Sequence, residues 1–479
     1  MADLISTLRH LVGAENVLDQ NEVSQRASHF WDSSPLQAAA LVKPANTAEV
    51  SSVLEACHAM GQSVVTHGGV TGLADGEKTT SDDLVLSLER MRNIEAIDTA
   101  GRTITVQAGC VLQHVQEAAQ QQGLLYGVDL GARGSCTIGG NIATNAGGLS
   151  VLRYGMTREQ VFGLEVVLAN GTVLNSMNAL MKNNAGYDLK QLFIGSEGTL
   201  GVVTRAVLRL RTNTPSVNTA LLAFENFEQV SSTLAHMSAN LNSQLNAFEI
   251  IWNRFYCLST DESISGSTRA PLSNNFSVYA IVESQGTNSD TDESVFMRAL
   301  ESAMHDGKIV DAVVAQSEKE RSAIWTIREN VDLVLRHQPA FIYDISLPIV
   351  NMENYLIKVE QQLKAHWPDV VVYAYGHLAD SNLHIAVAPK PGNYVYKPEG
   401  ANLETPALTD EHAEWYRLTN EIMFTPLSAF GGSVSAEHGI GLLKKPYMRY
   451  SRTEQEIATM QLLKQSLDPT GILNPGKIV

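Results

Sequence analysis

The chain has 479 residues, of which 44% are hydrophobic and 18% are charged, and its formal net charge is −17. This composition is typical of a globular protein of two or three domains and excludes a disordered or fibrous chain. The acidic balance argues against nucleic acid or an anionic membrane surface as the main partner. No apolar run approaches the ~18 residues of a membrane-spanning helix, and four cysteines without CxxC spacing favour reduced thiols and a cytoplasmic location.

The first part of the chain alternates helix and strand signals. The first 20 residues indicate an amphipathic helix. Asn46 or Thr47 is expected to cap a second helix, which ends at Gly61. Strands are expected at residues 63–66, 84–88, 103–108 and 164–169, and the last of them meets the hairpin turn signal Asn170-Gly171.

A different order of elements follows from about residue 217. The expected order is strand, helix, strand, strand, helix, strand, at 220–224, 227–237, 248–252, 276–282, 293–304 and 311–315. This order resembles a ferredoxin-like antiparallel sheet. A helix is expected at 323–335, and the remaining chain is expected to form helices and one hairpin.

Two glycine-rich segments are candidates for binding a cofactor phosphate. The first is 67–72, directly after a strand signal, and the second is 131–148, which reads GARGSCTIGGNIATNAGG. Glycines let backbone N–H groups approach phosphate oxygens closely. Neither segment contains GxGxxG, which disfavours a nicotinamide site. The alternative that these are only turns stays open, more for the first segment than for the second.

Four segments resemble one flavoprotein family. Residues 66–76, 134–148 and 192–204 resemble the FAD-binding domain of the vanillyl-alcohol-oxidase and cresol-methylhydroxylase family, and residues 468–477 resemble its C-terminal signature. The resemblance implies an α+β fold: a two-subdomain FAD-binding domain with a ferredoxin-like substrate (cap) domain and a helical C-terminal segment. The implied division is an N-terminal helical segment (1–35), the FAD-binding domain (36–213), the substrate or cap domain (214–425) and a C-terminal segment that returns to the FAD domain (426–479).

The same resemblance implies how FAD is bound. Val70 stands where some relatives carry a histidine for covalent attachment, so noncovalent FAD is expected. The residues expected to bind the cofactor are His67, Gly68, Gly69, Val70, Thr71, Gly72, Gly134, Ser135, Thr137, Gly139, Gly140, Asn141, Thr144, Asn145, Gly147, Gly148, Gly198, Val203 and Asn474.

The segment YGHLADSNLH contains two histidines, His377 and His384, seven residues apart. On one uninterrupted strand they would point to opposite faces. If residues 379–382 form a four-residue hairpin loop, Leu378 pairs with Leu383, and the two histidines face each other with Cβ atoms ~5 Å apart. Glu437 would add a carboxylate and leave coordination positions for a substrate. The alternative for each histidine alone is a structural role.

The motifs YGHLxDxNLH and SAEHGIG resemble the D-2-hydroxyglutarate and D-lactate dehydrogenase branch of this flavin family. The resemblance implies that His377, His384 and Glu437 bind a divalent metal. Zinc is expected first, with manganese, cobalt and ferrous iron as alternatives. It also implies that the adjacent His438 is the catalytic base.

By the same resemblance, Arg328 stands where relatives place a carboxylate-binding arginine, and the expected substrate contacts are Arg328 and Asn382. The fork of a guanidinium suits a carboxylate, although the alternative for Arg328 is an ordinary helix-surface arginine. Ile342 and Ala386 stand where the hydroxyglutarate-type enzymes carry lysine and asparagine. Because an unpaired buried carboxylate is costly, this favours D-lactate or an apolar D-2-hydroxy monoacid, with D-2-hydroxyglutarate as the alternative.

The expected function is FAD- and metal-dependent oxidation of a D-2-hydroxy acid to the 2-oxo acid, by proton abstraction from the hydroxyl and hydride transfer to the flavin. The alternatives are an oxygen-using flavin oxidase of the same fold, a noncatalytic flavin-binding subunit and, more remotely, a His/His/Glu metallohydrolase. By family analogy, we expect an electron-transfer flavoprotein or a quinone as the electron acceptor, and we allow for a homodimer.

Overall fold

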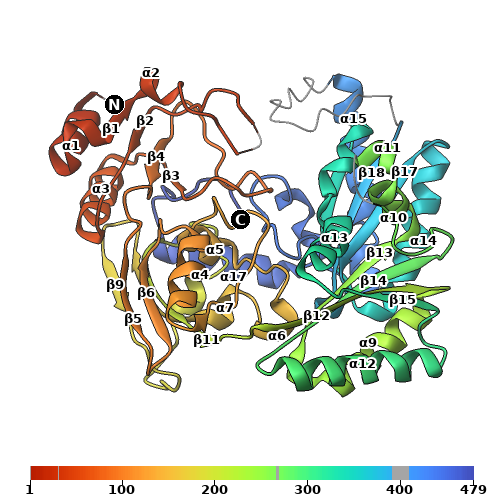
Figure 1. Cartoon of the computed structure of the whole chain (residues 1–479). Coiled ribbons are helices and arrows are strands. Elements are labelled where there is room, and N and C mark those ends of the chain that lie inside the picture. The colour runs from red at the N-terminus through yellow and green to blue at the C-terminus, as the bar shows by residue number, and fades with distance from the viewer. Residues whose placement is uncertain (1, 31, 266–268, 391–408) are drawn as a thin grey trace.

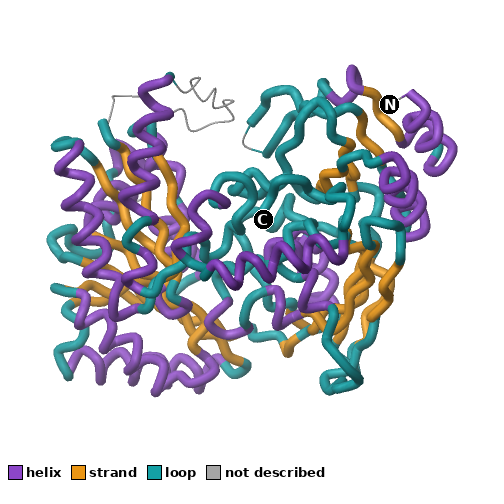
Figure 2. The backbone as a smooth tube through the Cα atoms, turned by 180° about the vertical axis from the view of Figure 1, so that it is seen from behind, coloured by secondary structure: helices purple, strands orange, loops and turns teal. Residues whose placement is uncertain are grey.

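The computed structural model describes residues 2–30, 32–265, 269–390 and 409–479. Two blocks of structure lie side by side, the first coloured red to yellow and the second green to light blue (Figure 1). Seen from behind, the strands gather in these two blocks with loops between them (Figure 2). Among the described residues, no helix combines the length and the apolar character that crossing a membrane requires.

A four-stranded sheet opens the first block. Its strand order is β1 (Val17–Asp19), β2 (Ala40–Val42), β4 (Leu84–Ser87) and β3 (Val64–His67), with β1 antiparallel to β2 and the other pairs parallel. The helices that accompany it are α1 (Ala2–Val12), the 3-10 helix η1 (Ala14–Asn16), α2 (Gln20–Val23) and α3 (Thr47–Met60). The predicted start and end of α3 are confirmed, because Asn46 accepts the N–H of Glu49 and Gly61 adopts φ 64°.

A second sheet of five antiparallel strands completes the first block. Its order is β5 (Ile94–Asp98), β6 (Thr103–Gln107), β10 (Val202–Arg209), β8 (Val161–Val167) and β9 (Val173–Ser176). The hairpin predicted at Asn170-Gly171 is confirmed, whereas the sequence reasoning did not predict β5 or β10. The remaining elements are α4 (Leu112–Gln121), α5 (Ile138–Thr144), α6 (Val151–Tyr154), α7 (Thr157–Gln160), α8 (Lys190–Phe193) and the pair β7 (Leu124–Leu125) and β11 (Arg211–Thr212).

The second block is built on one antiparallel sheet of seven strands. Its order is β15 (Asp311–Val314), β12 (Ser216–Phe224), β14 (Val278–Gly286), β13 (Leu245–Trp252), β17 (Val371–His377), β18 (Asn382–Ala388) and β16 (Phe341–Ser346). The first four strands in this list have the ferredoxin-like order, which confirms that prediction. The predicted hairpin, β17–β18, and the edge strand β16 extend the sheet.

The two faces of this sheet are covered by different helices. One face packs on α9 (Phe227–Leu241), α12 (Ser289–His305), α14 (Ile349–His366) and α15 (Asp410–Phe424). The other packs on α10 (Asn253–Thr260), α13 (Glu318–Glu329) and the 3-10 helix η3 (Val331–Arg336). Because strand side chains alternate between faces, Glu249, Asp344, His377 and His384 all lie on the second face.

The helix predicted at 323–335 begins and ends earlier in the structure. It starts after Ser317, which accepts the N–H of Glu320, and it ends at Glu329, where η3 takes over. The sequence reasoning overlooked this capping signal. The other short helices are η2 (Asn242–Gln244), α11 (Glu262–Ser265), the turn η4 (Leu378–Asp380), α16 (Leu427–Phe430) and η5 (Lys445–Tyr450).

The C-terminal part of the chain returns to the first block. Lys464 of helix α17 (Glu454–Leu467) donates a hydrogen bond to the carbonyl of Thr199, in the first block, at 2.8 Å. Beyond it, Leu473 bridges Val64 of β3 and is buried in the core of the first block.

Candidate active site

The hairpin of β17 and β18 places His377 and His384 on one face of the sheet, as predicted, but the predicted register is wrong. His384 pairs with Tyr375, two residues before His377. The loop starts one residue earlier than predicted, with the turn η4 followed by Ser381 in the left-handed region (φ 69°). Since a shift of two residues keeps side chains on the same face, the two imidazole centroids still lie 5.4 Å apart.

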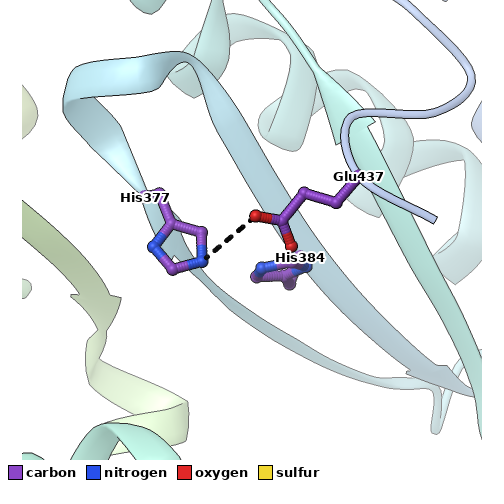
Figure 3. A group of neighbouring side chains, drawn as sticks. All are labelled: His377, His384 and Glu437. Atoms are coloured by element: carbon purple, nitrogen blue, oxygen red, sulfur yellow. Dashed lines mark ion pairs between the residues drawn. The ribbon is translucent and has the colours of Figure 1, made fainter. Parts of the chain in front are cut away.

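Glu437 completes this group from the loop between α16 and η5. Candidate ligand atoms of His377, His384 and Glu437 all lie within 4.8 Å of one another (Figure 3). Nε2 of His377 is 3.9 Å from Oε1 of Glu437, and the same oxygen accepts the backbone N–H of Gly148 at 2.9 Å. Two imidazoles and one carboxylate at these separations could hold a divalent metal.

Glu249 on β13 ties His377 to Arg328. Its Oε1 is 2.6 Å from Nδ1 of His377, and its Oε2 accepts the Nε–H of Arg328 at 2.9 Å. Burial opposes a proton on His377, but the charge and hydrogen bond of Glu249, together with Glu437, outweigh burial and raise the pKa of His377 to about 9. A carboxylate on one ring nitrogen, with the other nitrogen free, is the usual arrangement of a metal-binding histidine.

Asp344 on β16 faces two histidines at once. Its Oδ1 is 3.7 Å from Nδ1 of His384, and its Oδ2 is 3.8 Å from Nδ1 of His438. Burial acts to raise the pKa of Asp344, but the charges of His438, Lys444 and His384 hold this pKa well below its usual range. Asp344 is therefore ionised at neutral pH.

His438, the predicted base, lies beside the group of possible metal ligands. Its ring stacks on that of His384 with centroids 6.3 Å apart. Burial lowers the pKa of His438, and Asp344 offsets this only in part. The imidazole is therefore uncharged at neutral pH, which is the state that can accept a proton.

Both predicted substrate contacts are buried close to this group. The guanidinium of Arg328 lies 4.7 Å from the ring centroid of Tyr375, and within the described chain Nε is its only hydrogen-bonded nitrogen. The amide of Asn382 donates to Oδ1 of Asp344 at 2.9 Å and to the carbonyl of Ile345 at 3.1 Å. Its Oδ1 has no partner among the described residues. A substrate contact by Arg328 or Asn382 stays a prediction.

The segments predicted to bind FAD meet in the first block. A Cβ on Gly68 would lie 2.4 Å from Oγ1 of Thr137, and a Cβ on Gly69 would lie 2.2 Å from the carbonyl oxygen of Ser135. Asn474 connects the C-terminal segment 468–477 to the segments 66–76 and 192–204. Its Oδ1 accepts the N–H of Thr66, and its Nδ2 donates to the carbonyl of Glu197. Only glycine permits the close approach of the first two segments.

Part of the second glycine-rich segment forms helix α5. The buried amide nitrogen of Asn141, on this helix, has no partner among the described residues, so a polar cofactor atom could satisfy it. At the far end of the segment, a Cβ on Gly147 would lie 3.1 Å from Oε1 of Glu437, whose oxygen Gly148 also contacts. The predicted flavin segment therefore touches the predicted metal group.

Three further predicted cofactor residues, His67, Val70 and Gly198, have defined surroundings in the first block. His67 is buried at the end of β3 with Nε2 2.8 Å from the carbonyl of Glu77, and burial lowers its pKa to about 4. Val70 adopts φ 52°, and Gly198 packs on Asn474.

We expect Gly69→Ala to lower the free energy of unfolding by about 1–3 kcal/mol, as overpacking does, and to reduce the flavin content. The reason is the 2.2 Å approach of the added Cβ to the Ser135 carbonyl. Thermal unfolding and flavin absorbance per chain measure both effects. Gly131→Ala is the matched control for stability, because a Cβ there meets no atom within 4 Å. Equal stability of the two variants, or a wild-type flavin content in Gly69→Ala, would contradict the prediction.

The sequence reasoning missed three acidic residues of this site. Glu249 and Asp344 are the acidic residues of the otherwise mainly apolar strands β13 and β16, and a lone charge in such a run is a signal that could have found them. The third, Asp380, lies in the turn η4 between the two histidines. Burial raises its pKa to about 7, although His377 acts to lower it, and its Oδ1 has no partner among the described residues.

Comparisons with known proteins agree with this architecture. Residues 38–176 match the FAD binding domain family, and residues 214–478 match the family described as FAD linked oxidases, C-terminal domain. The chain is 39% identical to D-2-hydroxyglutarate dehydrogenase of Xanthomonas citri pv. viticola, over 94% of this chain and 90% of that protein. It is 34% identical to the mitochondrial D-2-hydroxyglutarate dehydrogenase of Arabidopsis thaliana, over 99% of this chain and 81% of that protein.

Among solved structures, p-cresol methylhydroxylase with substrate bound superposes with a TM-score of 0.75 at 15% sequence identity, covering 100% of this chain and 96% of that chain. At this low identity, the likeness concerns the fold alone. It confirms the predicted fold class, a two-subdomain FAD-binding domain with a substrate domain.

Proposed function

Because the chain belongs to the FAD-linked oxidase family, with its FAD-binding domain and C-terminal domain, we propose that it oxidises a D-2-hydroxy acid at a flavin beside a divalent metal. Family membership makes it an FAD-dependent oxidoreductase that acts on a CH–OH donor. The names of its relatives support a D-2-hydroxy acid as the substrate class. The observation that carries the proposal is the hydrogen bond from Gly148, in the predicted flavin segment, to Glu437, in the predicted metal group.

We assign the metal to His377, His384 and Glu437. A divalent ion bound there would hold the hydroxyl and carboxylate oxygens of the substrate and lower the pKa of the hydroxyl. The donor set fits such an ion, because Glu249 holds Nδ1 of His377 and leaves Nε2 directed toward Glu437. Two nitrogen donors and one oxygen donor favour zinc, with manganese, cobalt and ferrous iron as alternatives.

We assign proton transfer to His438. Its Nδ1 faces Asp344, so Nε2 is the nitrogen left to accept the proton of the substrate hydroxyl. The flavin, when bound, accepts the hydrogen of the substrate Cα as hydride. In the described part of the chain the terminal amino groups of Arg328 have no hydrogen-bond partner, since its pairing with Glu249 uses only Nε, and they could bind the substrate carboxylate.

An apolar row lies next to this chemistry on the same face of the sheet. Ile342 pairs with Ala386, and Ala386 pairs with Tyr373. This row lies two residues along the strands from the pairing of Asp344 with His384, which is the next position on the same face. None of the three side chains in this row carries a charge. The row supports D-lactate or a larger apolar D-2-hydroxy monoacid as the substrate, because none of its three side chains offers a charged partner to a second carboxylate.

D-2-hydroxyglutarate is the second candidate, since the relatives carry its name. The deciding experiment measures kcat/KM with a dye acceptor for D-lactate, apolar D-2-hydroxy acids, D-2-hydroxyglutarate and the L-enantiomers. We expect an apolar D-monoacid to exceed D-2-hydroxyglutarate by at least about tenfold, which corresponds to about 1.4 kcal/mol. The reverse order would assign D-2-hydroxyglutarate, and no turnover of any 2-hydroxy acid would contradict the function.

The same assays test the remaining proposals. Chelation is expected to abolish turnover and added zinc or manganese to restore it, whereas activity unaffected by chelation would contradict the metal role. Oxygen uptake during turnover would assign an oxidase, and its absence supports our proposal of an electron-transfer flavoprotein or a quinone as the acceptor.

A further inference from the structure

Two buried carboxylates hold the loop that carries Glu437 and His438. Oδ2 of Asp344 accepts the backbone N–H groups of three consecutive residues, 436–438, at 3.2, 3.0 and 3.0 Å. Oε1 and Oε2 of Glu197 accept the N–H groups of residues 440 and 441 at 2.7 and 2.8 Å. Asp344 belongs to the seven-stranded sheet and Glu197 to the first block, so the loop is fixed from both sides.

Asp344 has contacts that Glu197 lacks. Each of its oxygens faces Nδ1 of an imidazole, Oδ1 at 3.7 Å from His384 and Oδ2 at 3.8 Å from His438. These separations are longer than hydrogen bonds, so the contacts are electrostatic. With Nδ1 of both rings turned toward one carboxylate, Nε2 of both rings is directed away from it. Nε2 of His384 is thereby left for the metal group, and Nε2 of His438 is left for the substrate of the proposed function.

Asp344 is itself held firmly. Its side chain is fully buried, and Oδ1 accepts the amide N–H of Asn382 at 2.9 Å. Nζ of Lys444 lies 3.1 Å from the backbone carbonyl of Asp344 and 3.5 Å from Oδ2. The pairing of β16 with β18 sets Asp344 directly opposite His384. Because these partners fix the position of the carboxylate, it can hold the groups around it in fixed positions as well.

We propose that Asp344 is a positioning residue that orients the proton acceptor His438 and the metal ligand His384 at the same time, through one carboxylate. The inference rests on the proposed function. It adds a coupling between the proton acceptor His438 and the metal ligand His384. Because both face the same carboxylate, a displacement of that carboxylate disturbs both.

The test is Asp344→Asn in the full-length holoenzyme. The amide has the same shape, and its oxygen can still accept N–H groups of the loop, but the negative charge facing the two imidazoles is lost. We expect kcat to fall by about 10²–10⁴-fold, the range that general-base catalysis contributes, with little change in KM. Flavin and metal per chain are measured alongside and are expected to remain, so that the fall reflects orientation.

Two comparison variants separate orientation from structural support. Glu283→Gln removes another buried carboxylate on the same face of the sheet, where it accepts hydrogen bonds from Thr219 and Trp325, and kcat should be unchanged. Glu197→Gln weakens the hold on the same loop without altering the charge that faces the imidazoles. It should therefore lower kcat by less than Asp344→Asn does. An equal loss of kcat in either comparison variant would overturn the proposal.

Wild-type kcat in Asp344→Asn would also overturn it. If that variant does not fold, Asp344→Glu replaces it, because glutamate keeps the charge but displaces the oxygens by one methylene group. Reduced kcat at wild-type flavin and metal content supports the proposal, and wild-type kcat refutes it. If the wild-type protein oxidises no 2-hydroxy acid, it is the proposed function that fails; if it does and these variants match it, only this inference fails.

Discussion

Replacing His438 by alanine is expected to lower kcat by about 10²–10⁴-fold, because the variant lacks the group that accepts the hydroxyl proton. The imidazole is partly buried and uncharged at neutral pH, and its Nδ1 faces Asp344. Glu437 also belongs, with Asp344 and His438, to a second group whose candidate ligand atoms lie within 4.8 Å of one another. We assign the metal to His377, His384 and Glu437, so the metal and flavin contents of His438→Ala should stay at wild-type levels. Anaerobic flavin reduction by substrate in a rapid-mixing experiment measures the affected step directly.

His236→Ala is the control for this experiment. His236 lies on α9 and contacts the carbonyl of Ala299, away from the site, so its removal should leave the rate of flavin reduction unchanged. A His438→Ala protein that keeps its metal and flavin and reduces the flavin at the wild-type rate would refute the assignment of the base.

Glu437→Gln is expected to release the metal and to lower kcat/KM by about 10³-fold or more, because a bound divalent ion supplies several kcal/mol of stabilisation to developing charge. The glutamine oxygen can still accept the N–H of Gly148, so the loop keeps its anchor while the anionic ligand is lost. Metal per chain and kcat/KM, measured on the same preparation, test both parts.

Glu283→Gln makes the same chemical change at a buried carboxylate outside the group and should retain metal.

The site also predicts a pH dependence of metal binding in the wild-type apoprotein. His377 holds a proton below its pKa of about 9, and this proton must leave when metal binds, so the affinity should rise about tenfold per pH unit until about pH 9. Wild-type metal content in Glu437→Gln, or an affinity independent of pH, would contradict the assignment.

Much of the local structure follows from short stretches of sequence. The cap at Asn46 and the left-handed Gly61 delimit α3, and the spacing of strands and helices after residue 217 predicts the ferredoxin-like order. Each of these depends on contacts within a few residues or on the spacing of consecutive elements, which the sequence displays directly. Spacing made His377 and His384 candidates through the expected hairpin, whereas the assignment of the ligands and of His438 as the base followed from the resemblance of the two motifs to one flavin family.

The hairpin register could not be obtained from the same information. The sequence indicates a turn between residues 378 and 382 but not where it starts, and a start one residue earlier moves the partner of His384 to Tyr375. The face was still predicted correctly, because a shift of two residues preserves the alternation of side chains.

The sequence alone therefore predicted the candidate metal ligands and the candidate base, and the tertiary structure decided what surrounds them. Glu249 reaches His377 because β13 lies next to β17 in the sheet, although the two residues are 128 positions apart. Asp344 reaches His384 and His438 because β16 pairs with β18 and the loop after α16 folds back onto that edge. A strand's neighbours are chosen by the packing of the whole sheet rather than by nearby residues, so the carboxylates that orient both histidines become visible only in the folded chain.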